Sequence, residues 1–437
     1  MSSVFAIREH TIEASYIREF SRATSQVQDD TLVQHVKQYT PIDNPKPEKG
    51  DITIIGAHAN GLPKVGVLLN LAVSVTCFHI LTMFQEVYEP LWEELYHQAK
   101  SQGVRIRDIY IADAAWQGRS GILNKDKLGN DPSWFDYSRD ILHMINTLRP
   151  PTPLIAVGHS FGGAALLNAS LTSPRTFTSI ILLDPVISRY ASVPGDLSVS
   201  PAAMSIYRRD NWPSREAAAQ SFGRSPFYQS WDRRAFDLWL QHGLEPTPDG
   251  NFTLTTTKHQ EVFTYLRPSW PAFDDKGKTV TNRDLAPDIE EGFVGDVNLV
   301  WPLYRPEPPS LLHRLPNVRP PVLYVFGGSS NLSPEALRDE KVHTTGAGIG
   351  GSGGASKGRV KGVVSEKCGH MIPLEAPRFC AENASSWIKV WLDRWRAEQE
   401  EYNDWAKKPQ EEKATISEEY KKHAGKPAKP SKGQAKL

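Results

Sequence analysis

The fold is decided by the stretch Leu154-Ile-Ala-Val-Gly158-His-Ser160-Phe161-Gly162-Gly163. Four apolar residues lead into a Gly-x-Ser-x-Gly turn and a small, apolar run follows, which predicts a strand, a sharp turn and a helix. Glycines on both sides of Ser160 permit a turn so tight that the serine has strained backbone angles. The turn exposes the hydroxyl and places the amide of Phe161 at the helix N-terminus, where it can stabilise an oxyanion. Ser160 is therefore predicted to be a nucleophile, and a chance glycine-rich turn is the weaker interpretation.

Strand and helix patterns alternate on both sides of this stretch. The expected strands are residues 51–56, 104–111, 154–157, 178–184, 321–326 and 360–365, and the expected helices are residues 86–100, 134–148, 332–341 and 377–396. The alternation predicts an α/β fold with a mostly parallel, doubly wound sheet and right-handed crossovers. Period-two alternation near the N-terminus adds antiparallel edge strands at residues 4–7, 14–17 and 32–36.

Composition divides the chain into an interrupted core and a tail. Residues 1–185 and 316–397 carry the strand and helix patterns of the core. Residues 186–315 are rich in Trp and Pro, with a helix expected at 205–220. An aromatic, Pro-rich insertion between two strands predicts a lid or cap over the carboxyl ends of the strands, where α/β proteins place their sites. Residues 398–437 are rich in Lys, Glu and Pro and poor in apolar residues, which predicts a disordered tail.

An apolar segment at residues 65–85 departs from this pattern. Its first 20 residues carry no formal charge and have the length and hydropathy of a membrane span. A span would separate the preceding loop from the helix at 86–100, and both must stay on the sheet, so no true membrane span is expected. A surplus apolar helix packed on the body is a second interpretation. The favoured one is a retained intron, because removing the segment joins Lys64 to Glu86 smoothly, and Val and Gln codons can supply the bounding GT and AG.

A serine nucleophile needs a base, and His370 is the predicted one. Among the 13 histidines, it alone follows a glycine just past the last predicted strand and precedes a helix. This is the place of the base in a Ser, acid, His chain order. His159 adjoins the serine, but a neighbour on a sharp turn points away from it, so a packing role is expected. His58 is expected to support the loop that contains it.

The acid that orients the base has two candidates. The usual place is the loop after the strand 321–326, but Gly327-Gly-Ser-Ser-Asn-Leu-Ser-Pro334 has no carboxylate. Asp184 ends the apolar strand after the nucleophile helix, where a carboxylate is costly unless it is paired. Asp184 is therefore the first choice and Glu335, on the following helix, the second. Capping of the next turn is the alternative role for Asp184.

The second oxyanion amide is expected in the loop His58-Ala-Asn60-Gly-Leu62-Pro, which follows a buried strand. In a strand–turn–helix site of this kind, that loop supplies an N–H to pair with the amide of Phe161. The amide of Leu62 is the first choice and that of Asn60 the second. A plain strand-to-helix turn is the alternative interpretation.

Charge and cysteine content narrow the classes of ligand. The formal net charge is zero, which does not favour nucleic acid as a partner. The three cysteines have no metal-ligand spacing, and the glycine-rich run at 346–354 opens no helix after a strand, so it is no dinucleotide fingerprint. The expectation is a chemistry without metal or cofactor, on a small, hydrophobic acyl substrate.

Several of these motifs together carry a family resemblance. They are Gly158–Gly163, His58–Gly61, Leu183–Pro185, Gly369-His370 and the terminal Ala435-Lys436-Leu437. The chain resembles the fungal peroxisomal α/β-hydrolases, a group that includes the yeast peroxisomal lipase and hydrolases of host-selective-toxin pathways. The resemblance implies an α/β-hydrolase fold with an inserted lid. It also implies a peroxisomal matrix address, since Ala-Lys-Leu is a conservative variant of Ser-Lys-Leu and can be read by the peroxisomal import receptor.

The expected function is hydrolysis of a carboxylic ester or related acyl compound through an acyl-enzyme, as in lipases, esterases and thioesterases. Ser160 would attack, His370 would move the proton, and Asp184 would orient His370. The alternative is a non-hydrolytic binding or accessory protein of a toxin or other secondary-metabolite pathway. The missing acid after residue 326 and the apolar segment at 65–85 favour this alternative.

Overall fold

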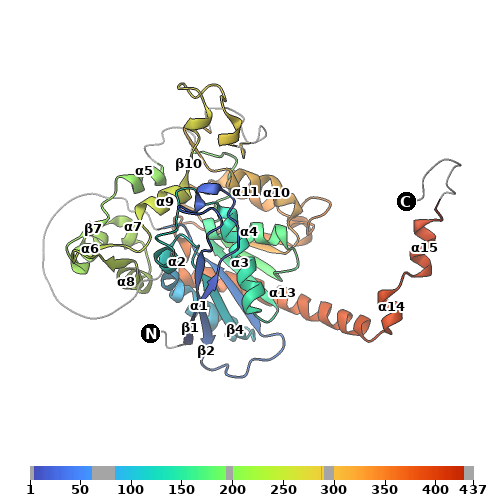
Figure 1. The fold of residues 1–437 in the computed structure, drawn as a ribbon. Helices are drawn as coiled ribbons and strands as arrows, with labels where there is room; N and C mark the ends of the chain where they lie inside the picture. The colour runs from blue at the N-terminus through green and yellow to red at the C-terminus, as the bar shows by residue number, and fades with distance from the viewer. Residues whose placement is uncertain (1–3, 62–83, 193–199, 287, 290–299, 428–437) are drawn as a thin grey trace. The chain divides into compact units, whose positions relative to one another are not determined.

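The computed structural model describes residues 4–61, 84–192, 200–286, 288–289 and 300–427. Its contacts divide into two units, Met1–Trp391 and Leu392–Leu437. The first unit contains an eight-stranded sheet in the order β1-β2-β4-β3-β5-β6-β12-β13. Figure 1 labels β1, β2 and β4 at one edge of this sheet. The strands are β1 (Phe5–Glu13), β2 (Val33–Pro41), β3 (Ile52–Ala57), β4 (Ile106–Ala112), β5 (Leu154–His159), β6 (Ser179–Leu183), β12 (Val322–Gly327) and β13 (Val360–Ser365).

Strand pairing confirms the predicted doubly wound sheet. β1 pairs with β2, and β2 with β4, in antiparallel register, whereas the pairs from β4 through β13 are parallel. Every residue of β3, β5, β6 and β12 is buried. Strands that are covered on both faces need continuous apolar runs. These runs are why the four strands could be predicted from the sequence.

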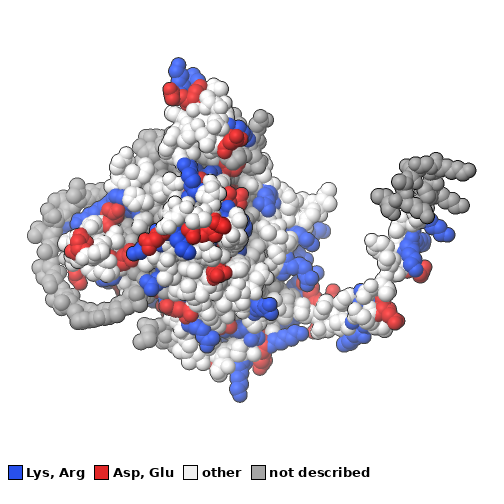
Figure 2. All heavy atoms as spheres, in the orientation of Figure 1, with Lys and Arg blue, Asp and Glu red and all other residues white. Residues whose placement is uncertain are grey.

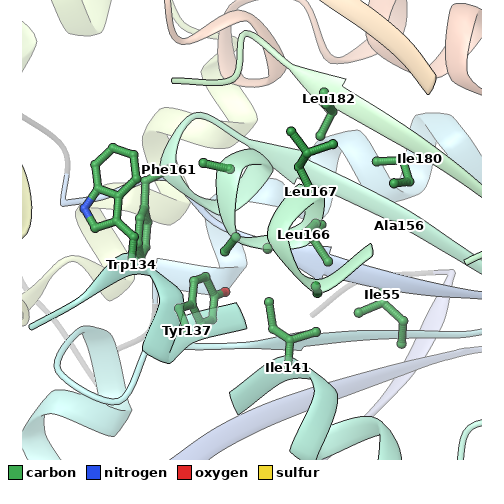
Figure 3. Close-up of a cluster of buried hydrophobic side chains, with 14 of the residues drawn as sticks. Ile55, Trp134, Tyr137, Ile141, Ala156, Phe161, Leu166, Leu167, Ile180 and Leu182 are labelled. Carbon is green, nitrogen blue, oxygen red and sulfur yellow. The ribbon is translucent and has the colours of Figure 1, made fainter. Parts of the chain in front are cut away.

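Helices cover both faces of this sheet. The helices of the core are α1 (Glu89–Ser101), α2 (Gly118–Leu123), α3 (Trp134–Leu148), α4 (Phe161–Thr172), α11 (Glu335–Thr344), α12 (Ile372–Glu375) and α13 (Pro377–Ala406), and a 3-10 helix, η2 (Phe84–Tyr88), precedes α1. Figure 3 shows α3 and α4 packed on the sheet, with Ile141 and Leu166 near Ile55, and Leu167 near Leu182. These side chains are fully buried, and burial of each stabilises the fold by about 1.5–3 kcal/mol. The packing fixes the N-terminus of α4 against the sheet.

The segment between β6 and β12, called the inserted segment, carries short elements. They are α5 (Pro201–Ile206), β7 (Asn211–Trp212), α6 (Arg215–Gly223), α7 (Pro226–Gln229), α8 (Arg233–His242), β8 (Leu244–Pro246), β9 (Phe252–Leu254), α9 (Lys258–Tyr265), β10 (Arg267–Pro268), β11 (Leu303–Tyr304) and α10 (Glu307–Arg314). The single helix predicted over 205–220 is wrong. Trp212 precedes a proline, which favours extended backbone, and Ser214 then caps α6 by accepting the N–H of Ala217 at 3.1 Å.

The predicted edge strand at 14–17 is also wrong. β1 ends at Glu13, and Ser15 turns toward α3, where its N–H and hydroxyl donate to Asp140 at 2.8 and 2.6 Å. Arg18 reaches the same carboxylate at 2.9 Å. Ile17 has a φ of 57°, which no regular strand permits. A buried charge from another element therefore overrides the local alternation.

The segment expected to be a disordered tail holds helical structure in its described part. α13 continues to Ala406, and α14 (Gln410–Ala414) and α15 (Glu418–Ala424) follow, with almost all side chains exposed. Ser417 caps α15, and Lys421 pairs with Glu418 at 2.6 Å, three residues away. Local capping and charge pairs of this kind support helix without a packed core. Residues 428–437 lie outside the described residues.

Two further observations concern the surface. No helix in the described ranges is long and apolar enough to cross a membrane, and residues 65–83 of the apolar segment lie outside those ranges. On the face drawn in Figure 2, acidic and basic side chains are interspersed.

Candidate active site

Ser160 occupies the sharp turn between β5 and α4. Its φ of 55° and ψ of −122° are strained for a residue with a side chain, as the motif predicts. Crowding explains both glycines. A Cβ on Gly158 would lie 2.8 Å from Cα of Gly163, and one on Gly162 would lie 2.5 Å from the carbonyl oxygen of Ala57. The start of α4 therefore lies directly against the end of β3.

His370 faces the serine from the loop between β13 and α12. Its Nε2 lies 2.8 Å from Oγ of Ser160, although 210 residues separate them. Its Nδ1 lies 2.6 Å from Oδ2 of Asp184. The structure thus brings the three residues that the sequence singled out into one hydrogen-bonded chain, with the geometry that nucleophile, base and orienting acid require.

Asp184 is fully buried at the end of β6, with a φ of 41°. Burial raises the pKa of its carboxyl, but hydrogen bonds from His370 and Ser330 outweigh burial and hold the pKa below its ordinary value. Ser330 donates its hydroxyl to Oδ2 at 2.5 Å. Ser330 lies in the loop after β12, the usual place for an acid. Glu335, the second candidate, is exposed in the first turn of α11.

The amide of Phe161 is the first of α4 and has no intrahelical partner. Its ring is buried, stacked on Tyr137 and edge-on to Trp134, with both centroid distances 5.2 Å (Figure 3). The packing fixes the residue that carries this N–H group. The amide can therefore stay aimed at a developing oxyanion without reorganisation.

Asn60 supplies the second candidate amide in the described chain. Its backbone N–H has no hydrogen-bond partner among the described residues, and the residue lines the cavity next to Ser160. The Asn60 side chain is held at both ends, because Gln117 donates to its Oδ1 at 2.5 Å and its Nδ2 donates to the carbonyl of Glu261 at 3.1 Å. Leu62, the first choice from the sequence, lies outside the described residues.

His58 is buried and supports the loop that contains it. Its Nδ1 donates to the carbonyl of Ala59 at 2.7 Å, and its Nε2 accepts the N–H of Ala114 at 3.0 Å. Burial lowers the pKa of His58 to about 4, so the ring is neutral at physiological pH. Both ring nitrogens of His159 are likewise engaged, neither of them with Ser160. Neither histidine is available as a base.

A cavity of about 550 Å³ opens onto Ser160 and His370. Its lining is mostly apolar and comes from the core and from the inserted segment, with Trp134, Leu266, Leu332, Leu337 and Met371 among its residues. A cationic side chain, Arg305, also lines it and is paired with Glu307 at 3.3 Å. An apolar acyl group fits such a lining. No cluster able to hold a metal ion occurs among the residues that the structure describes.

Comparison with known proteins decides the family. Residues 82–383 match the Alpha/beta hydrolase family. The type I acyl-CoA thioesterase mpaH' of Penicillium brevicompactum is 36% identical over 427 residues, covering 92% of this chain and 91% of that protein. The chain belongs to the alpha/beta hydrolase family. The abhydrolase domain-containing protein AKT2 of Alternaria alternata is 28% identical over 246 residues, which cover 54% of this hydrolase and 83% of that protein.

Solved structures show the same fold. The peroxisomal alpha-beta-hydrolase of Saccharomyces cerevisiae superposes with a TM-score of 0.64 at 16% identity, over 95% of this hydrolase and 100% of that chain. The alpha/beta hydrolase family and the mostly parallel sheet that the resemblance implied are confirmed. The sequence did not point to Ser330, Gln117 or α9 as neighbours of the site. Each lies far in sequence from the residue that it contacts. The only sequence signal was the absence of a carboxylate after β12, which left open what that loop contributes to the site.

Proposed function

We propose that this hydrolase cleaves acyl thioesters of coenzyme A through an acyl-enzyme on Ser160. The hydrogen-bonded chain from Ser160 through His370 to Asp184, facing an apolar cavity, is the observation that carries the proposal. Similarity to acyl-CoA thioesterases over about nine-tenths of both chains favours the thioester over other acyl compounds.

The reaction follows from the geometry. His370 Nε2 accepts the hydroxyl proton as Ser160 Oγ bonds to the acyl carbon, and the N–H groups of Phe161 and Asn60 stabilise the oxyanion. The tetrahedral intermediate collapses, the carbon–sulfur bond breaks, and His370 returns the proton to the departing thiolate. Water then attacks the acyl-enzyme with His370 as base, which releases a carboxylic acid and restores Ser160. Asp184 holds the imidazole in the required tautomer throughout.

A substrate panel tests this proposal. Release of free thiol from acyl-coenzyme A compounds of increasing chain length is measured beside release of p-nitrophenol from the matching esters. The proposal expects a higher kcat/KM for the thioesters and loss of both activities in Ser160→Ala. Turnover of the esters alone would contradict the thioester assignment, whereas turnover that survives in Ser160→Ala would contradict the acyl-enzyme.

The accessory-protein alternative rested partly on a missing acid, and Asp184 lies where such an acid would act. No observation on the described residues now favours that alternative over hydrolysis.

We further propose that the protein is imported into the peroxisomal matrix. The support is the terminal Ala435-Lys436-Leu437, together with the fold shared with a peroxisomal hydrolase of yeast. A fluorescent protein fused to the N-terminus should colocalise with a peroxisomal marker and become diffuse when the last three residues are removed. A diffuse signal from the intact fusion would contradict the proposal.

A further inference from the structure

Two buried polar side chains connect the loop at residues 58–61 to the backbone of His370. The N–H of Ala59 donates to the hydroxyl oxygen of Tyr88 at 2.9 Å. That hydroxyl lies 2.8 Å from Nδ1 of His159. Nε2 of His159 lies 2.9 Å from the backbone carbonyl oxygen of His370. Tyr88 and His159 are 4% and 1% exposed, so water does not compete for these bonds.

The chemistry of the end groups fixes the direction of every bond in this chain. The carbonyl of His370 can only accept, so Nε2 of His159 carries the ring hydrogen and donates it. Nδ1 of the neutral ring is then an acceptor, so Tyr88 donates its proton to Nδ1, and the Tyr88 oxygen accepts from the Ala59 amide, which can only donate. One tautomer of His159 therefore satisfies all four groups.

The ring of His159 is neutral in this arrangement. Burial and the nearby His370 lower the pKa of His159 to about 3. The ring centroids of the two histidines are 5.3 Å apart. A charged ring at that distance would oppose the imidazolium that forms on His370 during turnover. A neutral donor anchors the backbone without that penalty.

We propose that Tyr88 and His159 are positioning residues of the hydrolytic reaction, an inference that rests on the proposed function. His159 holds the backbone of His370, so that the imidazole stays between Ser160 and Asp184. Tyr88 accepts the N–H of Ala59, so that in this loop the amide of Asn60 is the one left to the oxyanion. One bond network thus sets the base and the oxyanion site together.

Tyr88→Phe tests this directly, because it removes one hydroxyl and keeps the ring. Tyr324→Phe is the matched control: its hydroxyl is also buried and bonds to Thr345 at 2.7 Å, away from the site. The readouts are kcat and KM on one acyl substrate, the rate of labelling by a fluorophosphonate, and the thermal midpoint. We expect kcat and the labelling rate to fall about tenfold in Tyr88→Phe, with KM within threefold of the original. We expect kcat to be unchanged in Tyr324→Phe.

Variants of His159 keep the inference testable if Tyr88→Phe does not fold. A glutamine can still donate an N–H to the carbonyl of His370, whereas a leucine of similar size cannot, so His159→Gln should retain several-fold more kcat than His159→Leu. Equal kcat in folded Tyr88→Phe and Tyr324→Phe, or in folded His159→Gln and His159→Leu, would overturn the inference. A starting protein that neither turns over substrate nor becomes labelled would instead overturn the proposed function.

Discussion

Oδ2 of Asp184 lies 2.6 Å from Nδ1 of His370, which is 186 residues away in the sequence. The same oxygen accepts a second hydrogen bond from the hydroxyl of Ser330. The carboxylate proposed as the acid therefore lies at the end of β6, while the loop after β12 contributes a hydroxyl. A carboxylate with two donors on one oxygen stays ionised, as the lowered pKa of Asp184 indicates. An ionised acid is what keeps the Nδ1 proton of His370 in place.

Asp184→Asn should abolish most of the activity. The amide donates where the carboxylate accepts, so the imidazole is held in the tautomer that has no free Nε2 lone pair for the Ser160 proton. We expect kcat to fall by about 10³–10⁴-fold with little change in fold. Glu335→Gln is the control, because Glu335 is exposed, and it should keep kcat within twofold. Loss of activity in Glu335→Gln alone would show that the acid is misassigned.

Ser330→Ala should have a smaller effect of the same kind. It removes one of the two donors to Asp184 and leaves the bond to His370. A lost hydrogen bond to a charged group costs about 1.5–3 kcal/mol in a buried site, and water entering the vacated space offsets part of it. We expect kcat to fall about tenfold, with the thermal midpoint lowered by a few degrees. Unchanged kcat at full stability would show that Ser330 does not support the acid.

The sequence predicted those parts of the site that neighbouring residues determine. The turn at Ser160 needs small residues two positions away on each side, and a carboxylate at the end of an apolar strand needs a partner. Both requirements can be recognised from neighbouring residues, so the sequence pointed to Ser160 and Asp184. Ser330 meets Asp184 across 146 residues, and Asn60 meets Glu261 across 201. Such contacts depend on how the loop after β12 and helix α9 pack against the core. The hydrophobic periodicity of a single segment does not predict this packing.

The same reason explains where the structure differs from the local pattern. The chain at 14–17 alternates like a strand, but a buried carboxylate on α3 captures Ser15 and ends β1. Helix in the described part of the tail arises from caps and pairs such as Ser417 and Lys421–Glu418, which composition alone does not show.

Asp113 makes stability depend on pH. It is fully buried, and its Oδ2 accepts the N–H of Arg119 at 2.8 Å. Burial raises the pKa of its carboxyl to about 7. A raised pKa means that its contribution to stability is complete below the ordinary pKa and is lost as pH rises toward 7.

Asp113→Asn, which cannot ionise, should therefore gain stability relative to the original protein by about 2 kcal/mol between pH 5 and pH 7. Urea unfolding at the two pH values measures the difference, with Asp339→Asn at an exposed position as control. A constant difference, or one that shrinks as pH rises, would contradict the assignment.

We propose that the apolar segment at residues 65–85 is a retained intron, and a deletion tests its role in the protein. Joining Lys64 to Glu86 keeps the ion pair of Glu86 with Lys37 and the contacts of Tyr88, and it loses the bond from Gln85 to the carbonyl of His35, which is 3.0 Å long. The shortened chain should therefore fold and react with a fluorophosphonate at least as fast as the full chain. Sequencing the messenger should show the 21 codons removed. A dominant messenger that keeps them, or a shortened chain that fails to fold, would refute this interpretation.

The central claim is that Ser160 is the nucleophile of a working hydrolase. Intact-mass measurement after treatment with a fluorophosphonate tests it most directly, with Ser160→Ala as the paired sample. We predict that the original protein gains the mass of one phosphonyl group, located on Ser160, and that folded Ser160→Ala gains none. A well-folded original protein that gains no mass, or a Ser160→Ala variant that gains as much, would contradict the claim.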